Sequence, residues 1–386
     1  MKLRSHCSGC GHDQLTGEFR LSRQPVVLNY RFARPSRAAR VPRRDIVLRQ
    51  CQRCGLIFNA AFEAELIPYD RNYENRQCFS PVFQGHLQTL ATGLTRRYRL
   101  RQGRILEVGC GKGDFLRLLC RTAEAVGVGF DTSYEPGSGP ESVDLQFFSR
   151  YLSATDVPGR FDAVICRHVV EHVGEIGSFL REIRDIAAAA GTPVVVIETP
   201  RFEWIAREHA IWDIVYEHCN YFPSHTLRYL CRLAGLDVRR QSAVFGGQYQ
   251  IIELQLAEQS RRTPRAPGIA KGASLALFAR QADTHLAKLT RRVLNRAAGR
   301  PWAIWGAGAK GVALANLLPA TKPAFVVDAN PQKQGGIIPG TRVPIISPED
   351  RRLDAIGLIL IANPNYAKEI GASLRARAFR GAVEIL

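Results

Sequence analysis

The chain has 386 residues, of which 46% are apolar and 23% charged, a composition typical of a globular protein with two or three domains. No apolar run approaches the roughly 18 residues of a membrane-spanning helix, and no secretory signal is visible, so we expect a cytoplasmic protein without a membrane partner. The net charge is +18, but aromatic residues are not interleaved with the scattered arginines, which favours a solvated basic surface over a nucleic-acid partner.

Two CxxC pairs stand near the N-terminus, Cys7 with Cys10 and Cys51 with Cys54. Two CxxC turns in one Pro- and Arg-rich segment can supply four thiolates to a tetrahedral zinc ion. In a cytosolic chain a metal is favoured over disulfides. The closed sulfur shell leaves no open position, so the predicted zinc is structural and holds together a segment with little core of its own.

The segment from Tyr69 to Glu74 carries two tyrosines ahead of a predicted helix at residues 81–101. Tyrosines in this place can fold over a ligand of the following domain. They can equally pack the N-terminal module onto its neighbour, and the sequence leaves both interpretations open.

The central segment is organised around ILEVGCGKGDF at residues 105–115. An apolar run predicts a buried parallel strand, and an amphipathic helix follows. Between them stand three glycines, where a side chain would keep the backbone away from a ligand at the helix N-terminus: Gly109, Gly111 and Gly113. The spacing E-x-G-x-G-x-G, with Glu107 on the strand, differs from the GxGxxG of dinucleotide sites and resembles motif I of class I S-adenosylmethionine-dependent methyltransferases.

The next predicted strand, at residues 125–130, ends in Asp131, which is positioned to accept hydrogen bonds from ribose hydroxyls. A later strand at residues 161–166 runs into RHVVEHV, which also resembles the methyltransferase pattern. By that resemblance His172 faces the substrate, although a structural histidine remains an open alternative. The resemblance also assigns three residues to the cofactor lining: Arg167, His168 and Val169. The remaining predicted helices lie at 176–190 and 224–234, and the remaining strands at 194–200, 238–244 and 250–257.

Residues 212–223, WDIVYEHCNYFP, gather ionisable and aromatic side chains in a loop past a strand's carboxyl end, where ligands bind in such sheets. Together with the CxxC pairs and the C-terminal segment, the E-H-x-x-Y-F run resembles the sugar C-methyltransferases of deoxysugar biosynthesis. The resemblance implies three acid–base residues: Glu217, His218 and Tyr221. The family's tyrosine two residues before the glutamate is Val215 here, with Tyr216 displaced by one position.

After a linker at residues 261–268 and a long helix at 269–298, GAGAKG forms a GxGxxG fingerprint that taken alone indicates NAD(P). Asp328 follows about 20 residues later, as the fingerprint requires. The continuation to residue 345 resembles instead the C-terminal domain of the sugar C-methyltransferases. By resemblance this Rossmann-like domain helps close over a sugar nucleotide.

We therefore expect an α/β fold in which a class I methyltransferase sheet is flanked by an N-terminal zinc-binding module and a C-terminal Rossmann-like domain. The expected boundaries are 1–75 for the zinc module, 76–260 for the methyltransferase domain, 261–300 for linker and long helix, and 301–386 for the C-terminal domain.

The predicted cofactors are S-adenosylmethionine and structural zinc, and the predicted substrate is a dTDP-type 4-keto-deoxysugar. Glu217 or His218 would remove a proton beside the ketone, and Tyr216 or Tyr221 would donate to the enolate oxygen. Methyl transfer to the resulting carbanion would follow. The alternatives are an O- or N-methyltransferase of another metabolite or glycan, and an RNA methyltransferase whose zinc module grips the nucleic acid.

Overall fold

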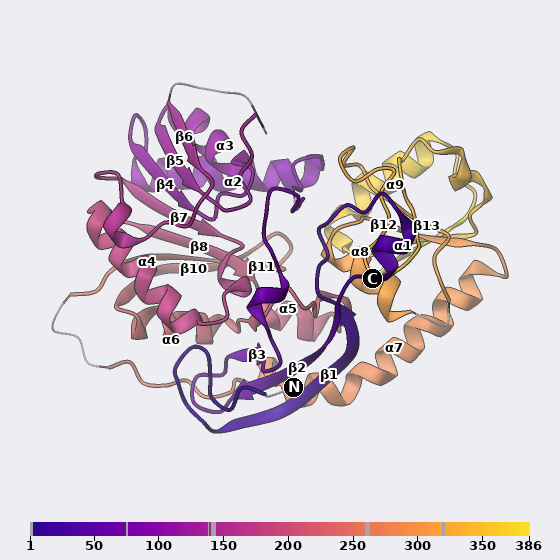
Figure 1. Ribbon diagram of the computed structural model, residues 1–386, viewed down its shortest axis with the longest axis horizontal. Coiled ribbons are helices and arrows are strands. Elements are labelled where there is room, and N and C mark those ends of the chain that lie inside the picture. Colours follow the sequence, from indigo (N-terminus) through magenta and orange to yellow (C-terminus); the bar gives the residue numbers. More distant parts are fainter. Residues whose placement is uncertain (1–2, 75, 138, 140–143, 259–262, 319–320) are drawn as a thin grey trace.

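The computed structural model describes residues 3–74, 76–137, 139, 144–258, 263–318 and 321–386. It contains an N-terminal, a central and a C-terminal β-sheet (Figure 1). In Figure 1 the central and C-terminal sheets lie beside each other, and the N-terminal strands run below both. The predicted linker at 261–268 lies partly outside the described residues. No helix in the described ranges is long and apolar enough to span a membrane.

The N-terminal sheet is antiparallel, with the order β1-β2-β3-β9. Its strands are β1 (Leu15–Pro25), β2 (Arg43–Cys51), β3 (Ile57–Asn59) and β9 (Asn220–Tyr221). The predicted Glu-His loop supplies β9, so this sheet is completed by the central segment. Between β1 and β2 the chain, with helix α1 (Pro35–Ala39), crosses to the C-terminal part, where Phe32 bridges to Ile337 (Figure 1). The N-terminal segment therefore acquires from its neighbours the core that its own composition lacks.

The central sheet has the strand order β10-β11-β8-β7-β4-β5-β6. Its strands are β4 (Arg104–Val108), β5 (Val126–Phe130), β6 (Leu145–Phe148), β7 (Ala163–Arg167), β8 (Val195–Pro200), β10 (Leu236–Val244) and β11 (Tyr249–Leu256). The first five pair in parallel, and the last two form an antiparallel edge. This arrangement confirms the predicted methyltransferase-type α/β fold.

Helices cover both faces of the central sheet. They are α2 (Pro81–Tyr98) and α3 (Asp114–Ala123) on one face, and α4 (Ile176–Ala190) and α6 (Ser224–Leu233) on the other. Successive residues of β4 point to opposite faces of the sheet: Ile105 packs with α2 and α3, whereas its neighbour Leu106 packs with α4 and α6. A strand buried on both faces needs apolar residues at consecutive positions, as this sequence has. The short helix α5 (Phe202–Arg207) follows β8.

The C-terminal sheet is parallel, with the order β14-β13-β12-β15-β16. Its strands are β12 (Trp302–Trp305), β13 (Phe325–Val327), β14 (Ile345–Ile346), β15 (Leu358–Ile361) and β16 (Ala382–Ile385), and its helices are α7 (Leu275–Ala297), α8 (Ala309–Leu317) and α9 (Ala367–Ala376). The long helix begins at Leu275 and not at residue 269, because the hydroxyl of Ser274 caps it by accepting a hydrogen bond from the Leu277 amide. The domain boundaries stay a prediction.

Candidate active site

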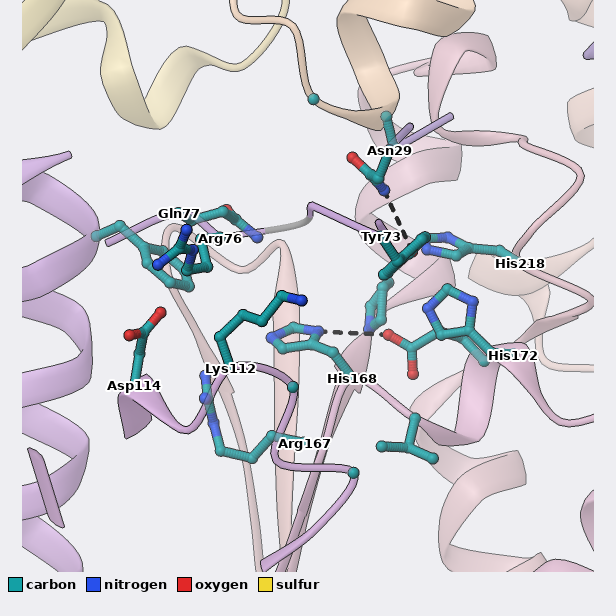
Figure 2. A pocket seen from close by; sticks show the side chains of 18 of the residues that line it. Asn29, Tyr73, Arg76, Gln77, Lys112, Asp114, Arg167, His168, His172 and His218 are labelled. Atoms are coloured by element: carbon teal, nitrogen blue, oxygen red, sulfur yellow. Dashed lines mark hydrogen bonds and ion pairs between the residues drawn. The ribbon is translucent and has the colours of Figure 1, made fainter. Parts of the chain in front are cut away.

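A cavity of about 750 Å³ opens between the carboxyl ends of the central and C-terminal strands. The turns after β4, β5 and β7 line one wall, the turns after β12, β13 and β15 line the other, and the start of α2 also contributes. Figure 2 shows side chains of the N-terminal and central segments around the cavity, among them Asn29, Arg167 and His218. Ligands of doubly wound sheets bind where strand ends and glycine turns meet in this way.

The glycine turn between β4 and α3 brings bare backbone to the cavity wall. Gly109, Gly111 and Gly113 have φ values of +73°, +55° and +83°, a region that favours glycine. A Cβ on Gly109 would lie 2.2 Å from Cγ2 of Val169, so no side chain fits there. Gly109, Gly111 and Val169 line the cavity, whereas Gly113 is not among the lining residues and caps α3.

Asp131, at the end of β5, stabilises this turn and lines the cavity. One carboxylate oxygen accepts a hydrogen bond from the Gly111 amide at 2.8 Å, and the other accepts from the Ser133 amide at 2.7 Å. The second oxygen also accepts from the Ser133 hydroxyl at 2.6 Å, so the oxygen bound to Gly111 keeps a further lone pair for a hydroxyl donor such as a ribose.

Two buried polar atoms on the same wall, Oε2 of Glu107 and Nη2 of Arg167, have no hydrogen-bond partner in the described part of the chain. Arg167 is held in place, because its Nε donates to Glu198 at 2.6 Å and its guanidinium lies 4.2 Å from the Phe115 ring centroid. Burial raises the pKa of Glu107 to about 8, against the opposing charge of Arg167. A ligand with an ammonium and a carboxylate group, such as the methionine end of S-adenosylmethionine, would satisfy both atoms.

The turn after β7 places His168 and Glu171 beside the cavity. Nδ1 of His168 lies 3.3 Å from one oxygen of Glu171, and the Thr199 hydroxyl donates to the other at 3.0 Å. Burial opposes ionisation of Glu171, but the hydrogen bond and charge of His168 lower its pKa to about 2. Glu171, His172 and His218 come within metal-binding distance of one another, at most 4.8 Å between ligand atoms. Because both oxygens of Glu171 already have partners, we interpret the group as a hydrogen-bonded cluster.

The imidazoles of His172 and His218 face each other at the cavity, with ring centroids 4.9 Å apart (Figure 2). Nδ1 of His172 lies 2.9 Å from the backbone oxygen of Glu217 and 2.8 Å from the Tyr69 hydroxyl. A carbonyl oxygen only accepts, so Nδ1 of His172 carries a proton and donates it. Burial, assisted by the charge of His172, lowers the pKa of His218 to about 3, so His218 is neutral at physiological pH.

Glu217 is buried and does not line the cavity. Its carboxylate accepts hydrogen bonds from the Leu28 amide at 2.6 Å, from the Tyr73 hydroxyl at 2.8 Å and from the Asn29 side chain at 3.4 Å. Burial raises the pKa of Glu217 despite these donors and the charge of His172. Glu217 therefore anchors Tyr73 and Asn29, both of which do line the cavity.

The structure corrects the expected position of two tyrosines, because neither Tyr216 nor Tyr221 lines the cavity. The Tyr216 hydroxyl accepts a hydrogen bond from the Glu63 amide at 3.0 Å. The Tyr221 hydroxyl accepts from the Val215 amide at 2.9 Å and donates to its carbonyl at 3.1 Å. Both phenols are thus bound to backbone, whereas Tyr69 and Tyr73 are among the tyrosines that line the cavity.

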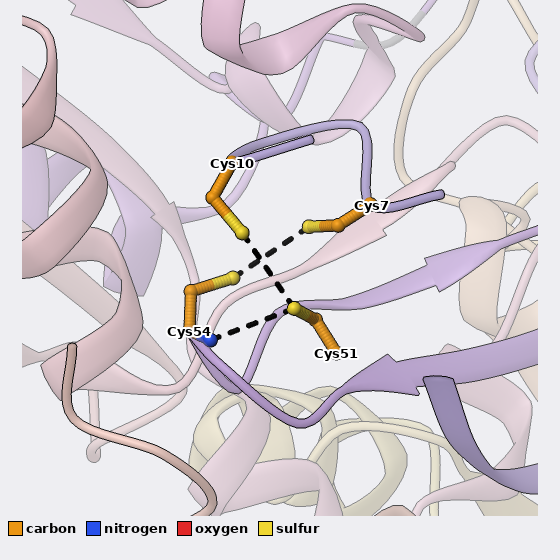
Figure 3. A group of neighbouring side chains, drawn as sticks. All are labelled: Cys7, Cys10, Cys51 and Cys54. Carbon is orange, nitrogen blue, oxygen red and sulfur yellow. Dashed lines mark hydrogen bonds between the residues drawn. The ribbon is translucent and has the colours of Figure 1, made fainter. Parts of the chain in front are cut away.

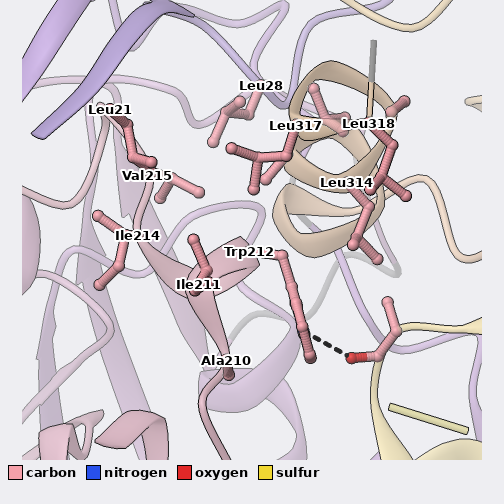
Figure 4. Close-up of a cluster of buried hydrophobic side chains, with 14 of the residues drawn as sticks. Leu21, Leu28, Ala210, Ile211, Trp212, Ile214, Val215, Leu314, Leu317 and Leu318 are labelled. Atoms are coloured by element: carbon pink, nitrogen blue, oxygen red, sulfur yellow. Dashed lines mark hydrogen bonds between the residues drawn. The ribbon is translucent and has the colours of Figure 1, made fainter. Parts of the chain in front are cut away.

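The loop before Glu217 is held by an apolar cluster that joins three parts of the chain (Figure 4). Its side chains come from the loop, from the N-terminal segment and from α8: Ile211, Trp212, Ile214 and Val215; Leu21 and Leu28; Leu314, Leu317 and Leu318. The indole of Trp212 also donates a hydrogen bond to the Ala362 carbonyl at 3.1 Å. The position of the loop therefore depends on both flanking segments.

The C-terminal wall contributes residues that the sequence did not single out. Lys310, inside the GxGxxG run, pairs with Asp213, and its Nζ lies 4.9 Å from the Trp204 ring centroid. Lys333 donates from Nζ to the Ala307 carbonyl at 3.1 Å, and both lysines line the cavity. The position of Lys310 inside the GxGxxG run could have indicated that it lies at a ligand site. No local pattern marks Asn29, which lies in an arginine-rich stretch far from the other cavity residues in sequence.

The four N-terminal cysteines converge as the spacing predicts (Figure 3). The sulfur atoms of Cys7 and Cys54 lie 3.6 Å apart, as do those of Cys10 and Cys51. Four thiolates around a tetrahedral zinc, each at about 2.3 Å, would stand roughly 3.8 Å from one another. The set of ligands therefore fits a closed, structural zinc site.

Residues 83–241 match a family model described as a methyltransferase domain, and residues 254–385 match one described as a C-methyltransferase C-terminal domain. C-methyltransferase NovU of Streptomyces niveus is 26% identical over 354 residues, covering 84% of this chain and 81% of that protein.

Solved structures similar to part of this chain include two methyltransferases. The 1,6-didemethyltoxoflavin-N1-methyltransferase of Burkholderia thailandensis is 15% identical, covers 46% of this chain and 82% of its own, and has a TM-score of 0.35. The magnesium protoporphyrin IX methyltransferase of Synechocystis PCC 6803 is 15% identical, covers 46% of this chain and 84% of its own, and has a TM-score of 0.36.

The central sheet with its glycine turn, together with the methyltransferase family match, defines this protein as an S-adenosylmethionine-dependent methyltransferase. The match of the C-terminal residues and the similarity to NovU along most of the chain identify the family more closely. They support a C-methyltransferase family for this chain.

Proposed function

We propose that this enzyme methylates the carbon beside the ketone of a nucleotide-linked 4-keto-deoxysugar. The observation that carries the proposal is that two imidazoles, His172 and His218, line the same cavity as the glycine turn at Gly109. A carbon acceptor must lose a proton to become nucleophilic, and a neutral imidazole beside the methyl donor suits that step.

The cofactor S-adenosylmethionine would supply, when bound, an electrophilic methyl group on a sulfonium. Glu107 and Arg167 would bind its ammonium and carboxylate groups, and Asp131 would accept from its ribose hydroxyls. The other residues proposed for this site shape its walls: Gly109, Gly111, Gly113, His168 and Val169. Gly113 acts indirectly, by allowing the turn into α3.

His218 is the proposed base. It would take the proton from the carbon beside the ketone, and the electrons of that C–H bond would move to the ketone oxygen to form an enolate. The Tyr69 hydroxyl lines the cavity and donates to the backbone oxygen of Glu217 at 3.4 Å, and it would turn this donor to the enolate oxygen when substrate binds. The enolate beside His218 favours the charged imidazole, so the pKa of His218 rises as the proton arrives.

Glu217 acts in this proposal as a positioning residue, because its carboxylate holds Tyr73 and the Asn29 segment. His172 would face the substrate next to the base. Lys310 and Lys333 on the opposite wall offer two cations to a diphosphate, which supports a nucleotide-linked substrate.

We also propose that Cys7, Cys10, Cys51 and Cys54 bind a structural zinc ion. Four sulfur ligands leave no open position on the metal, so the zinc would not take part in methyl transfer. Its contribution would be to the folding of the N-terminal segment.

Hydrogen exchange in D₂O tests the proposal. With a dTDP-4-keto-6-deoxyhexose and S-adenosylhomocysteine, which has no methyl to give, the wild-type enzyme should exchange the hydrogen beside the ketone, and His218→Asn should not. With S-adenosylmethionine the product should carry one additional C-methyl group. O-methylation is the second candidate, because Tyr216 is displaced by one position from the family pattern and an alcohol acceptor needs no enolate. An O-methyl product formed without exchange would establish that candidate instead.

A further inference from the structure

The first cysteine knuckle touches the segment that carries the active-site histidines. Ser8 stands between Cys7 and Cys10, and its hydroxyl donates to Oδ1 of Asn220 at 3.1 Å. Its backbone oxygen accepts from the Gly177 amide, at the start of α4, at 3.0 Å. The packing is close, since a Cβ on Gly177 would lie 2.4 Å from the backbone oxygen of Gly9. The knuckle therefore lies directly against the elements that flank the active site.

Asn220 joins this knuckle to the turn that carries His172. Its side-chain Nδ2 donates to the Val173 carbonyl at 2.7 Å and to the Val170 carbonyl at 3.3 Å. These two carbonyls bracket Glu171 and His172. Only 2% of Asn220 is exposed, so these contacts are sheltered from competing water.

Backbone hydrogen bonds link the same region to His218. The Cys219 amide, next to His218, donates to the Glu171 carbonyl at 2.8 Å, and the Asn59 amide donates to the Cys219 carbonyl at 2.9 Å. Asn220 then pairs with Phe58 of β3. Strand β3 follows the second knuckle, so each knuckle contacts the histidine segments by a separate route.

The histidine segments have little regular structure to hold them. His172 ends a three-residue 3₁₀ turn, Val170–His172, and His218 precedes the two-residue strand β9. Elements this short contribute few hydrogen bonds of their own. Catalytic groups must nevertheless stay within about 0.5 Å of their working geometry.

We propose that Ser8 and Asn220 are positioning residues through which the four-cysteine knuckles set the relative placement of His172 and His218. The inference rests on the proposed roles of the two histidines. It gives the predicted zinc module a specific task in the reaction, although the metal would stay outside the cavity. Neither residue touches substrate or cofactor, so both act through the histidines.

Two variants test the proposal in the full-length, zinc-loaded enzyme. Ser8→Ala removes one hydroxyl and no cysteine ligand. Asn220→Asp keeps the acceptor for Ser8 but replaces the amide that donates to Val170 and Val173. Ser178→Ala is the matched control, because it makes the same change at an exposed position in the adjacent helix α4.

The measurements separate positioning from loss of the fold. Zinc content and S-adenosylhomocysteine affinity should stay at wild-type values, while the ¹⁵N resonances of the His172 and His218 imidazoles should shift. Turnover should fall roughly tenfold in Ser8→Ala and further in Asn220→Asp, with little change in KM, since small displacements of catalytic groups are costly. The control should leave resonances and turnover unchanged.

Unchanged imidazole resonances and full turnover in both variants would overturn the proposal. The proposal would also be overturned if Ser8→Ala lost turnover only in proportion to lost zinc while Asn220→Asp stayed fully active. The NMR measurement does not depend on turnover, so it tests the positioning proposal by itself. If the proposed reaction were wrong, the wild-type enzyme would fail to methylate the keto sugar, while the two variants would still shift the imidazole resonances.

Discussion

Glu217→Gln distinguishes a positioning glutamate from a catalytic base. The carboxylate accepts three hydrogen bonds, from the Leu28 amide, the Tyr73 hydroxyl and the Asn29 side chain. A glutamine has the same shape but only one acceptor oxygen, and its amide presents donors to groups that are themselves donors. At a site that is 1% exposed, water cannot replace the lost partner.

The expected cost follows from these contacts. A hydrogen bond to a charged group contributes about 1.5–3 kcal/mol, so losing one and weakening a second should lower the free energy of unfolding by about 2–4 kcal/mol. Misplacing Tyr73 and the Leu28 segment should lower kcat by roughly 10- to 100-fold. His218→Asn removes the proposed base and should lower kcat by about 10²- to 10⁴-fold with little change in stability.

Urea unfolding and steady-state kinetics measure the two effects on the same samples. Tyr73→Phe provides a double-mutant cycle, in which a coupling free energy of at least about 0.5 kcal/mol with Glu217→Gln is expected for residues in contact. The reasoning would be refuted if Glu217→Gln kept wild-type stability and lost as much kcat as His218→Asn. That result would make Glu217 the base.

The glycine turn, the buried imidazole of His218 and the cysteine cluster each give a further prediction. Gly109→Ala should abolish binding of S-adenosylhomocysteine, measured by calorimetry, while the circular dichroism spectrum stays unchanged. The reason is that the added Cβ would lie 2.2 Å from Val169, at a φ of +73°. Tight binding would contradict the proposal that the glycine turn contacts the cofactor. His218 binds its proton less readily in the folded chain, so the stability it contributes is complete above about pH 6.5 and is lost as the pH falls toward about 3. Urea midpoints should therefore decline more steeply in that range for the wild type than for His218→Asn, and parallel curves would count against a neutral buried imidazole. Cys10→Ser should reduce bound zinc, measured by atomic emission, and lower the thermal midpoint; a full zinc content would remove this cysteine from the ligand set.

Local spacing made the glycine turn and the cysteine pairs readable from the sequence. Gly109 and Gly111 stand between a buried strand and a helix, and only residues without Cβ allow the backbone this approach to a ligand. Each CxxC pair likewise confines two sulfurs to one turn, so four cysteines in two pairs predict their own cluster. The acid at the end of the next strand, Asp131, follows from the same local logic.

Tertiary structure alone decided which members of the Glu-His loop reach the cavity. Glu217 and His218 are neighbours in sequence, yet the carboxylate of Glu217 accepts from the Leu28 amide whereas the imidazole of His218 lines the cavity. That choice depends on the apolar cluster around Trp212, to which the N-terminal segment and α8 contribute from opposite ends of the chain. Side-chain direction in an irregular loop is set by such distant contacts, which no local pattern encodes, because each partner is chosen by packing and not by spacing along the chain.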